Sequence, residues 1–445
     1  MNDFIWPVAM LLGLMAGIFS GYPVAFVLAG VGIFFAVIAE VPMLFLSIGV
    51  QRIFSGVLTN WLLIAIPLFV FMGLMLERSG VAERLLRSLA SLFRSLPGGY
   101  AFAVALIGVI MAASTGIIGA SVVLMGMMAL PPMLQNGYDP KISTGLIAAS
   151  GTLGILIPPS VMLIILGDQL GISVGSLFTG AIGPGLLLAL LYVGYLVLIV
   201  IRSPERMPPM AQAAPVGIGT LLWRLGFDLL LPIVLILSVL GTIVAGVATP
   251  TESAAIGAAG AMLLAILSRR LNLRNLGEAL SDSTRTTAMI IFVMIGATIF
   301  SMVFRKLGGD RMIIDLFSLE GSSPYASFLL IMFVVFLLGF FLEWVEITLV
   351  VVPIVAPVIT GLDFGLPKEE ALAWFAIALA VNLQTSFLTP PFGYALFYLR
   401  GIARDVPITT IYRGVIPFVV LQLIALGLII TFPGITLWLP GYLSR

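Results

Sequence analysis

Cysteine and histidine are both absent from this 445-residue chain, and charged residues make up only 9% of it. The missing thiols and imidazoles exclude disulfides, thiolate nucleophiles, imidazole bases and most transition-metal sites. A soluble domain carries about 25% charged residues because its surface faces water, so this surface is expected to face lipid. The net charge of +1 gives no electrostatic basis for nucleic-acid binding. No GxSxG elbow or phosphate loop is present either, which disfavours an enzyme.

Hydrophobic residues make up 61% of the chain, and they recur in nearly uncharged segments. These segments are about 20 residues long, the length that crosses roughly 30 Å of hydrocarbon. The expected fold is therefore an all-α polytopic membrane protein. The N-terminus lacks the basic stretch of a signal peptide, so its first segment is expected to remain as a membrane helix. The predicted spans are 4–20, 22–39, 61–76, 139–168, 173–201, 229–247, 251–268, 286–304, 371–399 and 414–432.

Two further apolar stretches, 99–134 and 325–360, are broken in the middle by AASTGIIGAS and EWVEIT respectively. Each half is short for a crossing, so we expect re-entrant helical hairpins. The spans 139–168 and 371–399 are interrupted too, by GTLGILIPPS and NLQTSFLTPPFG. Paired prolines remove amide donors and break a helix. Irregular backbone persists at membrane depth only where it is buried in protein or lines a wet cavity.

The basic residues favour one orientation of this layout. With both termini on the periplasmic side, 15 of the 21 lysines and arginines fall in cytoplasmic segments. The remaining six, which include Arg52 and Arg305, fall on the periplasmic side, where Asp168 is also expected. Arg78, Arg84 and Arg285 are among the 15. This distribution agrees with the excess of positive charge usual in cytoplasmic loops.

The two halves of the chain resemble each other. Four blocks align: 21–30 with 248–257, 68–73 with 291–296, 157–160 with 389–392, and 183–191 with 416–424. Each half holds about five spans and one hairpin, and an odd number of crossings turns the second half upside down. Inverted repeats with helices broken at matching positions indicate a transporter. An ancient duplication without a transport role is the alternative.

The first candidate site combines the first hairpin tip with the segment before the first proline pair. Its residues are Ser114, Thr115, Gly116, Ser150, Gly151 and Thr152. Hydroxyls and freed carbonyls are uncharged oxygen donors of the kind that bind Na⁺ at half-helix ends in carriers. The alternative for any single hydroxyl is that it bonds back to a helix carbonyl.

The second candidate site occupies the matching place in the other half. Its residues are Glu343, Glu346, Thr348, Asn382, Gln384, Thr385, Ser386 and Thr389. A carboxylate inside an apolar segment is costly and points to function. Either glutamate could ligate a cation, pair with a partner or carry a proton. The alternative places both in the headgroup region beside Trp344, since aromatic residues gather there.

A substrate is expected between the two hairpin tips. The candidate contacts are Ser114, Thr115, Glu343, Glu346, Thr385 and Ser386. Helix N-termini at the broken segments would favour an anion. No basic residue lies near the midplane in this layout, so a carboxylate would be held by backbone N–H groups, hydroxyls, amides and Na⁺.

Several blocks together resemble the large membrane subunit of tripartite ATP-independent periplasmic (TRAP) transporters. They are GYPVAF at 21–26, IPLFVFMG at 66–73, GYDP at 137–140, IPPS at 157–160, ATPTE at 248–252 and TPPFGYALF at 389–397. The match runs nearly end to end. EWVEIT and NLQTS depart from the commonest pattern and leave the second-site ligands open.

The resemblance implies a Na⁺-driven, elevator-type carrier of organic acids in the bacterial inner membrane. It also implies two partners, a small four-helix membrane subunit and a periplasmic substrate-binding protein. Sodium ligation would fall on the first tip with the loop ending at Pro158, and on the second tip with 382–390. The implied regions are scaffold or arm helices at 1–60, a transport region at 61–201, a linker with arm helices at 202–281, and a second transport region at 282–445.

Two alternatives remain at this point. One is a stand-alone Na⁺/carboxylate symporter of the same architecture. The other is an intramembrane enzyme, for which Glu343 and Glu346 would be the only nearby acid–base pair. The sequence does not identify the substrate.

Overall fold

The computed structural model describes residues 4–115, 118–210, 218–317, 323–390 and 393–443, and these form helices and turns without a β-strand. The all-α prediction is confirmed for this part of the chain. The first half comprises α1 (Ile5–Phe19), α2 (Val24–Ile38), α3 (Met43–Ile53), the π-helical turn η2 (Phe54–Leu58), the 3-10 turn η3 (Trp61–Ile64), α4 (Ala65–Arg78), α5 (Val81–Leu92), α6 (Gly99–Thr115), α7 (Ile118–Gln135), α8 (Pro140–Thr152), the 3-10 turn η4 (Leu153–Ile155), α9 (Val161–Leu170), α10 (Val174–Arg202) and the 3-10 turn η5 (Pro204–Arg206).

The second half begins with two long helices that follow an interhelical linker. It comprises α11 (Ile218–Val244), α12 (Pro250–Leu267), α13 (Leu273–Lys306), α14 (Gly309–Phe317), α15 (Pro324–Leu338), α16 (Trp344–Glu346), the π-helical turn η6 (Ile347–Val351), α17 (Val352–Gly361), α18 (Lys368–Ser386), α19 (Tyr394–Ile402), α20 (Ile408–Thr431) and α21 (Gly434–Leu443).

Several helices start at a capping residue followed by proline. Asp139, Thr249 and Ser323 each accept a backbone N–H of the first turn, and each precedes the first residue of its helix, a proline. Proline suits this position because its missing N–H would have no helical partner. At α12, Glu252 completes a capping box by accepting the Thr249 N–H at 2.8 Å. These local signals fix where the helices begin.

Seven helices among the described residues are long and apolar enough to cross a membrane. Five coincide with predicted spans: Trp61–Arg78, Val174–Arg202, Pro250–Leu267, Leu273–Lys306 and Ile408–Thr431. The other two, Ile118–Gln135 and Trp344–Gly361, are the second arms of the predicted hairpins. The remaining predicted spans are shorter or broken helices. Helix α3 was not among the predicted spans, because Ser47, Gln51 and Arg52 interrupt its apolar pattern.

Exposed side chains on many helices are large and apolar. Leu44, Leu190, Ile201 and Leu237 are between 61% and 77% exposed. A soluble protein rarely exposes apolar surface on this scale. Together with the seven long apolar helices, these side chains identify a multi-pass membrane protein.

Both predicted proline breaks are present, but the helices before them run further than expected. Helix α8 includes Ser150–Thr152 and α18 includes Asn382–Ser386, so these residues are helical rather than unwound. The breaks follow at 153–160 and, among the described residues, at 387–390 and 393. The second hairpin also differs, since its turn lies at 339–343 and both Glu346 and Thr348 are helical. A proline clashes with the turn before it, yet a helix can continue until just before that turn.

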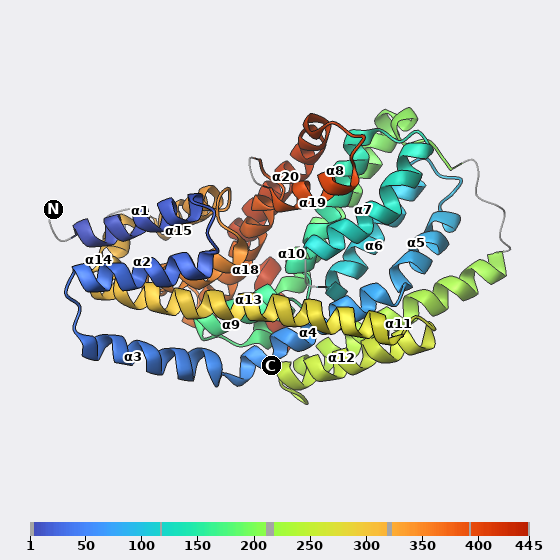
Figure 1. The fold of residues 1–445 in the computed structure, drawn as a ribbon. Coiled ribbons are helices and arrows are strands. Elements are labelled where there is room, and N and C mark those ends of the chain that lie inside the picture. The colour runs from blue at the N-terminus through green and yellow to red at the C-terminus, as the bar shows by residue number, and fades with distance from the viewer. Residues whose placement is uncertain (1–3, 116–117, 211–217, 318–322, 391–392, 444–445) are drawn as a thin grey trace.

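Helix α13 extends through much of the molecule and contacts α2, α3 and α4 (Figure 1). Helix α4 in turn packs on α12. In the repeat alignment, α2 corresponds to α12 and α4 corresponds to α13, so the pairs α2–α13 and α4–α12 are equivalent. These reciprocal contacts agree with the alignment, while the inverted relation of the two halves and the division into transport and scaffold regions stay predictions.

Candidate functional site

A cavity of about 590 Å³ lies between the two hairpins. Residues 118–120 at the start of α7 and Glu343–Val345 at the second hairpin turn both line it, and residues of α4 and α13 form other parts of its wall. Phe387, Tyr394 and Tyr398, from the second broken helix, complete it. We call it the tip cavity. Its size is within the range of small-molecule sites, roughly 300–1,000 Å³.

The two glutamates of the second hairpin have different surroundings. Glu346 accepts the backbone N–H of Glu343 and so caps the short helix α16. Glu343 lines the tip cavity, and its neighbour Trp344 is only 8% exposed. A headgroup aromatic would be far more exposed, so the arrangement favours the cavity over the headgroup alternative. Glu343 is the better placed of the two for a ligand.

Glycine at position 119 lets the two halves of the site approach each other. A Cβ at Gly119 would lie 2.9 Å from Cζ of Tyr398. The ring of Tyr398 therefore packs directly on the start of α7. This contact joins the first hairpin to the second broken helix.

At the first break, Ser150 and Thr152 are buried. The Thr152 hydroxyl donates to the carbonyl of Ala149 at 2.9 Å, as the back-bonding alternative expected. The Ser150 hydroxyl has no partner among the described residues. Gly151 fits against Val122, whose Cγ2 would lie 2.5 Å from an added Cβ. Pro158 is buried in the break itself, where the Ser160 hydroxyl donates to the Ile155 carbonyl at 2.5 Å.

At the second break, the hydroxyls of Thr385, Ser386 and Thr389 each donate to a carbonyl one turn earlier in α18. The amide nitrogen of Asn382 donates to the Met332 carbonyl at 2.7 Å, which leaves its Oδ1 without a partner. The Gln384 Oε1 is also buried without a partner among the described residues.

The two breaks meet in the interior. The Gln384 Nε2 lies 3.4 Å from the Thr152 Oγ1, joining the end of α18 to the end of α8. The repeat alignment pairs these two positions with each other, and it pairs Ser150 with Asn382. The aligned residues Thr152 and Gln384 contact each other. The aligned residues Ser150 and Asn382 each carry an oxygen without a partner among the described residues.

Thr348 also has a buried hydroxyl without a partner among the described residues. Its π-helical turn contacts α9, just beyond the first break. Unsatisfied oxygens therefore occur at both breaks and on the second hairpin. A hydroxyl that donates its proton keeps lone pairs as well, so the back-bonded threonines and Ser386 can still face a cation.

Part of the first predicted site cannot be compared with the structure. Ser114 and Thr115 end α6, but their side chains and all of Gly116 lie outside the described residues. Their predicted roles stay predictions.

Sequence reasoning missed Arg285, Tyr394 and Tyr398, all of which line the tip cavity. Arg285 was assigned to a cytoplasmic loop because the span was predicted to begin after it. Helix α13 instead starts at Leu273 and carries Arg285 along the cavity wall. A basic residue therefore lines the cavity between the two hairpins, whereas the predicted layout placed none there. Helix α13 is 34 residues long, whereas a hydropathy window detects only its apolar part and misses the charged first turns.

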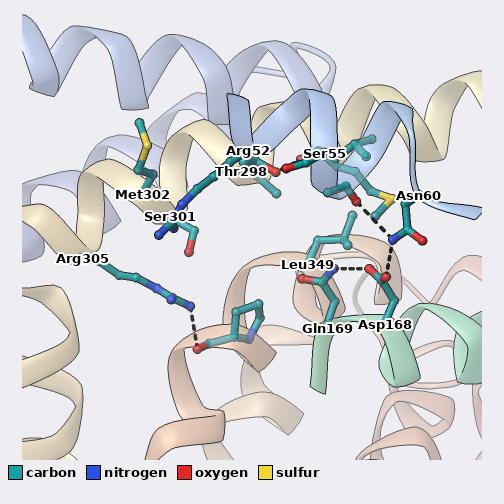
Figure 2. Close-up of a pocket in the computed structure, with 15 residues that line it drawn as sticks. Arg52, Ser55, Asn60, Asp168, Gln169, Thr298, Ser301, Met302, Arg305 and Leu349 are labelled. Carbon is teal, nitrogen blue, oxygen red and sulfur yellow. Dashed lines mark hydrogen bonds between the residues drawn. The ribbon is translucent and has the colours of Figure 1, made fainter. Parts of the chain in front are cut away.

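A second cavity, of about 350 Å³, lies further along α13 and is lined by polar side chains. We call it the arginine cavity. Figure 2 shows Arg52 and Arg305 on the same side as Ser301, with Asn60, Asp168 and Gln169 grouped opposite. Asp168 accepts from the Asn60 Nδ2 at 2.6 Å and from the Gln169 Nε2 at 2.9 Å.

The charged residues group as the predicted layout requires. Arg52, Asp168 and Arg305, all expected on the periplasmic side, surround the arginine cavity. Arg78 pairs with Asp282 at 2.7 Å and Arg84 pairs with Asp228 at 3.1 Å, both on the side expected to be cytoplasmic. The grouping agrees with two separate faces but does not say which face is which.

The chain is similar to known membrane transport proteins. The family model described as "Tripartite ATP-independent periplasmic transporter, DctM component" matches residues 11–435. The sialic acid TRAP transporter large permease protein SiaM of Vibrio cholerae is 29% identical over 444 residues, which cover 97% of this chain and 98% of that protein. The C4-dicarboxylate TRAP transporter large permease protein DctM of Pseudomonas aeruginosa is 28% identical over 390 residues, or 86% of this chain and 87% of that one.

A solved structure supports the fold alone. The crystal structure of the Alcanivorax borkumensis YdaH transporter superposes with a TM-score of 0.58 at 17% identity, covering 87% of each chain. The two named relatives are transport proteins rather than enzymes. This chain therefore belongs to the DctM family, the large-permease component of tripartite ATP-independent periplasmic transporters.

Proposed function

We propose that this chain is the permease subunit for Na⁺-coupled uptake of an organic acid across the bacterial inner membrane. Sialic acid and C4-dicarboxylates, named for two relatives, are both organic acids. Arg285 in the wall of the tip cavity offers a guanidinium to a carboxylate, a pairing with favourable bidentate geometry.

The observation that carries the proposal is the set of unsatisfied oxygens around the two helix breaks. Ser150 Oγ, Thr348 Oγ1, Asn382 Oδ1 and Gln384 Oε1 are buried without partners among the described residues. A buried polar group without a hydrogen bond costs roughly 1–3 kcal/mol, and a cation would offset that cost. Unsatisfied oxygens also occur elsewhere, on Glu77, Thr287, Asp310, Gln422 and Thr436, so what distinguishes this set is its place at the two breaks and on the second hairpin.

The donor chemistry fits Na⁺. The four oxygens belong to two hydroxyls and two amides, which are hard donors without net charge. Half-helix ends add carbonyls and the negative end of the helix dipole, as in other Na⁺-coupled carriers. No group of three or more acidic residues that could hold a divalent metal occurs among the described residues.

Two partners complete the proposed system, a small four-helix membrane subunit and a periplasmic substrate-binding protein. The family description names a tripartite, periplasmic transporter, which supports both. The excess of positive charge on one side of the layout supports periplasmic termini. In this orientation the arginine cavity faces the periplasm, and the tip cavity lies nearer the cytoplasm. An elevator-type movement of the two hairpins would change the side of the membrane that each cavity faces.

Reconstitution tests the coupling. The chain, the small subunit and the binding protein are placed in liposomes, and uptake of a radiolabelled organic acid is measured. We expect uptake with an inward Na⁺ gradient and at least about tenfold less when choline replaces Na⁺, as loss of one or two charge-stabilising contacts predicts. Uptake that ignores Na⁺ would remove the coupling and leave the family assignment intact.

Omitting one component tests the tripartite arrangement. Liposomes without the binding protein should show little uptake at low substrate concentration. Full uptake without it would favour the stand-alone symporter.

A further inference from the structure

The tip cavity holds two charges that the protein does not balance. Glu343 enters it from the second hairpin and Arg285 from α13. Neither forms an ion pair with another described residue. The third charged residue of the wall, Asp282, is already bonded to Arg78 at 2.7 Å. The cavity therefore offers an unpaired carboxylate and an unpaired guanidinium on different walls.

The wall around Glu343 is aromatic. Trp344, Phe387, Tyr394 and Tyr398 all line the cavity, and the rings of Phe387 and Tyr394 have centroids 6.3 Å apart. Aromatic faces attract cations through the ring quadrupole, most strongly when both are withdrawn from water. Trp344, the best of these rings for such a contact, is only 8% exposed.

Three other occupants fit this wall less well. A neutral or aromatic group would bury Glu343 without a counter-charge, which is costly. A second carboxylate on the substrate would face Glu343 and be repelled. Sodium prefers several hard oxygens, and the unsatisfied oxygens of Ser150, Asn382 and Gln384 lie at the breaks and do not line this cavity. An organic cation satisfies both the carboxylate and the rings.

We infer that the transported acid is a zwitterion, with its carboxylate toward Arg285 and a substituted ammonium group among Glu343 and the aromatic side chains. The inference rests on the proposed function and specifies its substrate class. It also assigns a reason for the departure of EWVEIT from the commonest family pattern, since this segment supplies both Glu343 and Trp344.

The test uses matched ligands that differ only in charge. Carboxylates ending in a trimethylammonium group, with two to five methylenes between the charges, are compared with carboxylates that end in tert-butyl. Binding to the purified full-length chain with its small subunit is measured by calorimetry in Na⁺ buffer. The best zwitterion should bind at least about tenfold more tightly than the tert-butyl carboxylate of the same chain length, as a desolvated cation–π and ion-pair contact predicts.

Substitutions locate the preference within the cavity. Glu343→Gln should bring the affinity ratio close to one while the isostere still binds, which shows that the site is folded. Glu205→Gln, at an exposed glutamate outside both cavities, should leave the ratio unchanged. Tyr394→Phe should keep the preference because the ring remains, whereas Tyr394→Leu should reduce it.

Equal affinity for the two ligand series, tighter binding of the isosteres, or no binding of either would overturn the inference. So would a Glu343→Gln variant with the full wild-type ratio. Failure of the proposed Na⁺ coupling gives another result: uptake would not depend on Na⁺, while the zwitterion would still bind more tightly than its isostere. An intact Na⁺ requirement with no charge preference would overturn the inference alone.

Discussion

The tip cavity and the arginine cavity are both lined by α13, yet their polar groups are in different states. In the arginine cavity Asp168 accepts two hydrogen bonds, and Arg305 donates to the Pro353 carbonyl at 3.0 Å. In the tip cavity Arg285 and Glu343 have no ion pair with another described residue. Asp168 and Arg305 thus have hydrogen-bond partners within the protein, whereas Arg285 and Glu343 lack an opposite charge; Glu343 accepts the backbone N–H of Glu346 in the capping box of α16.

The comparison shows that the number of polar side chains is a poor guide to a binding site. The arginine cavity is the more polar of the two, and by composition alone it would be the better candidate. Buried polar groups in folded proteins are nearly always hydrogen-bonded, so an unsatisfied group carries more information than a satisfied one. We therefore assign Asp168 and Arg305 a structural role, joining α9, α13 and the second hairpin. Arg52 of α3 differs from them, because its side chain has no hydrogen bond or ion pair with another described residue.

The largest expected effect separates the unsatisfied hydroxyl of the second hairpin from one elsewhere in the fold. Thr348 and Thr436 are both buried and both lack a partner for Oγ1 among the described residues. Thr348→Val should lower Na⁺-driven uptake at limiting Na⁺ by about tenfold or more, because a cation ligand is lost. Thr436→Val, the same isosteric change in α21, should leave the Na⁺ dependence unchanged. Equal effects of the two substitutions would contradict the assignment of Thr348.

An intermediate effect compares the arginines of the two cavities. Arg285→Gln should raise the KM for the organic acid by about tenfold, as expected for a lost hydrogen bond to a charged group. Arg305→Gln removes a contact to a backbone carbonyl and should change KM by less than about twofold. Initial uptake rates over a range of substrate concentrations measure both. A larger KM effect at Arg305 would reverse the roles of the cavities.

A smaller effect is expected within the arginine cavity. Asp168→Asn keeps the size of the side chain but loses an acceptor for Asn60 or Gln169. We expect a loss of about 1 kcal/mol in stability, the usual net worth of one hydrogen bond, with KM unchanged. Thermal unfolding in detergent, alongside uptake, would detect this. An unchanged unfolding temperature together with a raised KM would point to ligand binding instead.

The smallest effect is expected at Asp139, which lines neither cavity. Partial burial of Asp139 raises its pKa, but hydrogen bonds from Arg206 and from the Lys141 N–H outweigh burial and lower it overall. The folded pKa is thus below the unfolded one, so the carboxylate stabilises the fold at neutral pH and this stabilisation is lost as the pH falls through the folded pKa. Asp139→Asn should lower the unfolding temperature slightly at pH 7, and the difference should shrink towards pH 4. A difference that grows on acidification would refute this account.

Local signals in the sequence predicted much of the site. The proline pairs at 158–159 and 390–391 located both helix breaks to within a few residues, because proline removes a donor and clashes with the preceding turn. The hydroxyls and amides before them were recognised as candidate ligands from that context. Three of these residues, Ser150, Asn382 and Gln384, carry unsatisfied oxygens in the fold.

What the sequence could not provide was the long-range arrangement. Tyr398 meets Gly119, and Gln384 meets Thr152, across more than 200 residues of chain. Arg285 escaped notice because a hydropathy window ends a span at the first charge, although the helix itself continues. Which of several threonines would be back-bonded and which left free depends on packing that no local pattern records.

The contact between Gln384 and Thr152 has one more consequence. Because this contact joins the two helix breaks, a change in the Gln384 side chain at one break would also affect Thr152 at the other. If each break holds one Na⁺, the two occupancies are thermodynamically linked, and the response of uptake to Na⁺ concentration should be sigmoidal, with a Hill coefficient that falls when the shared amide is removed.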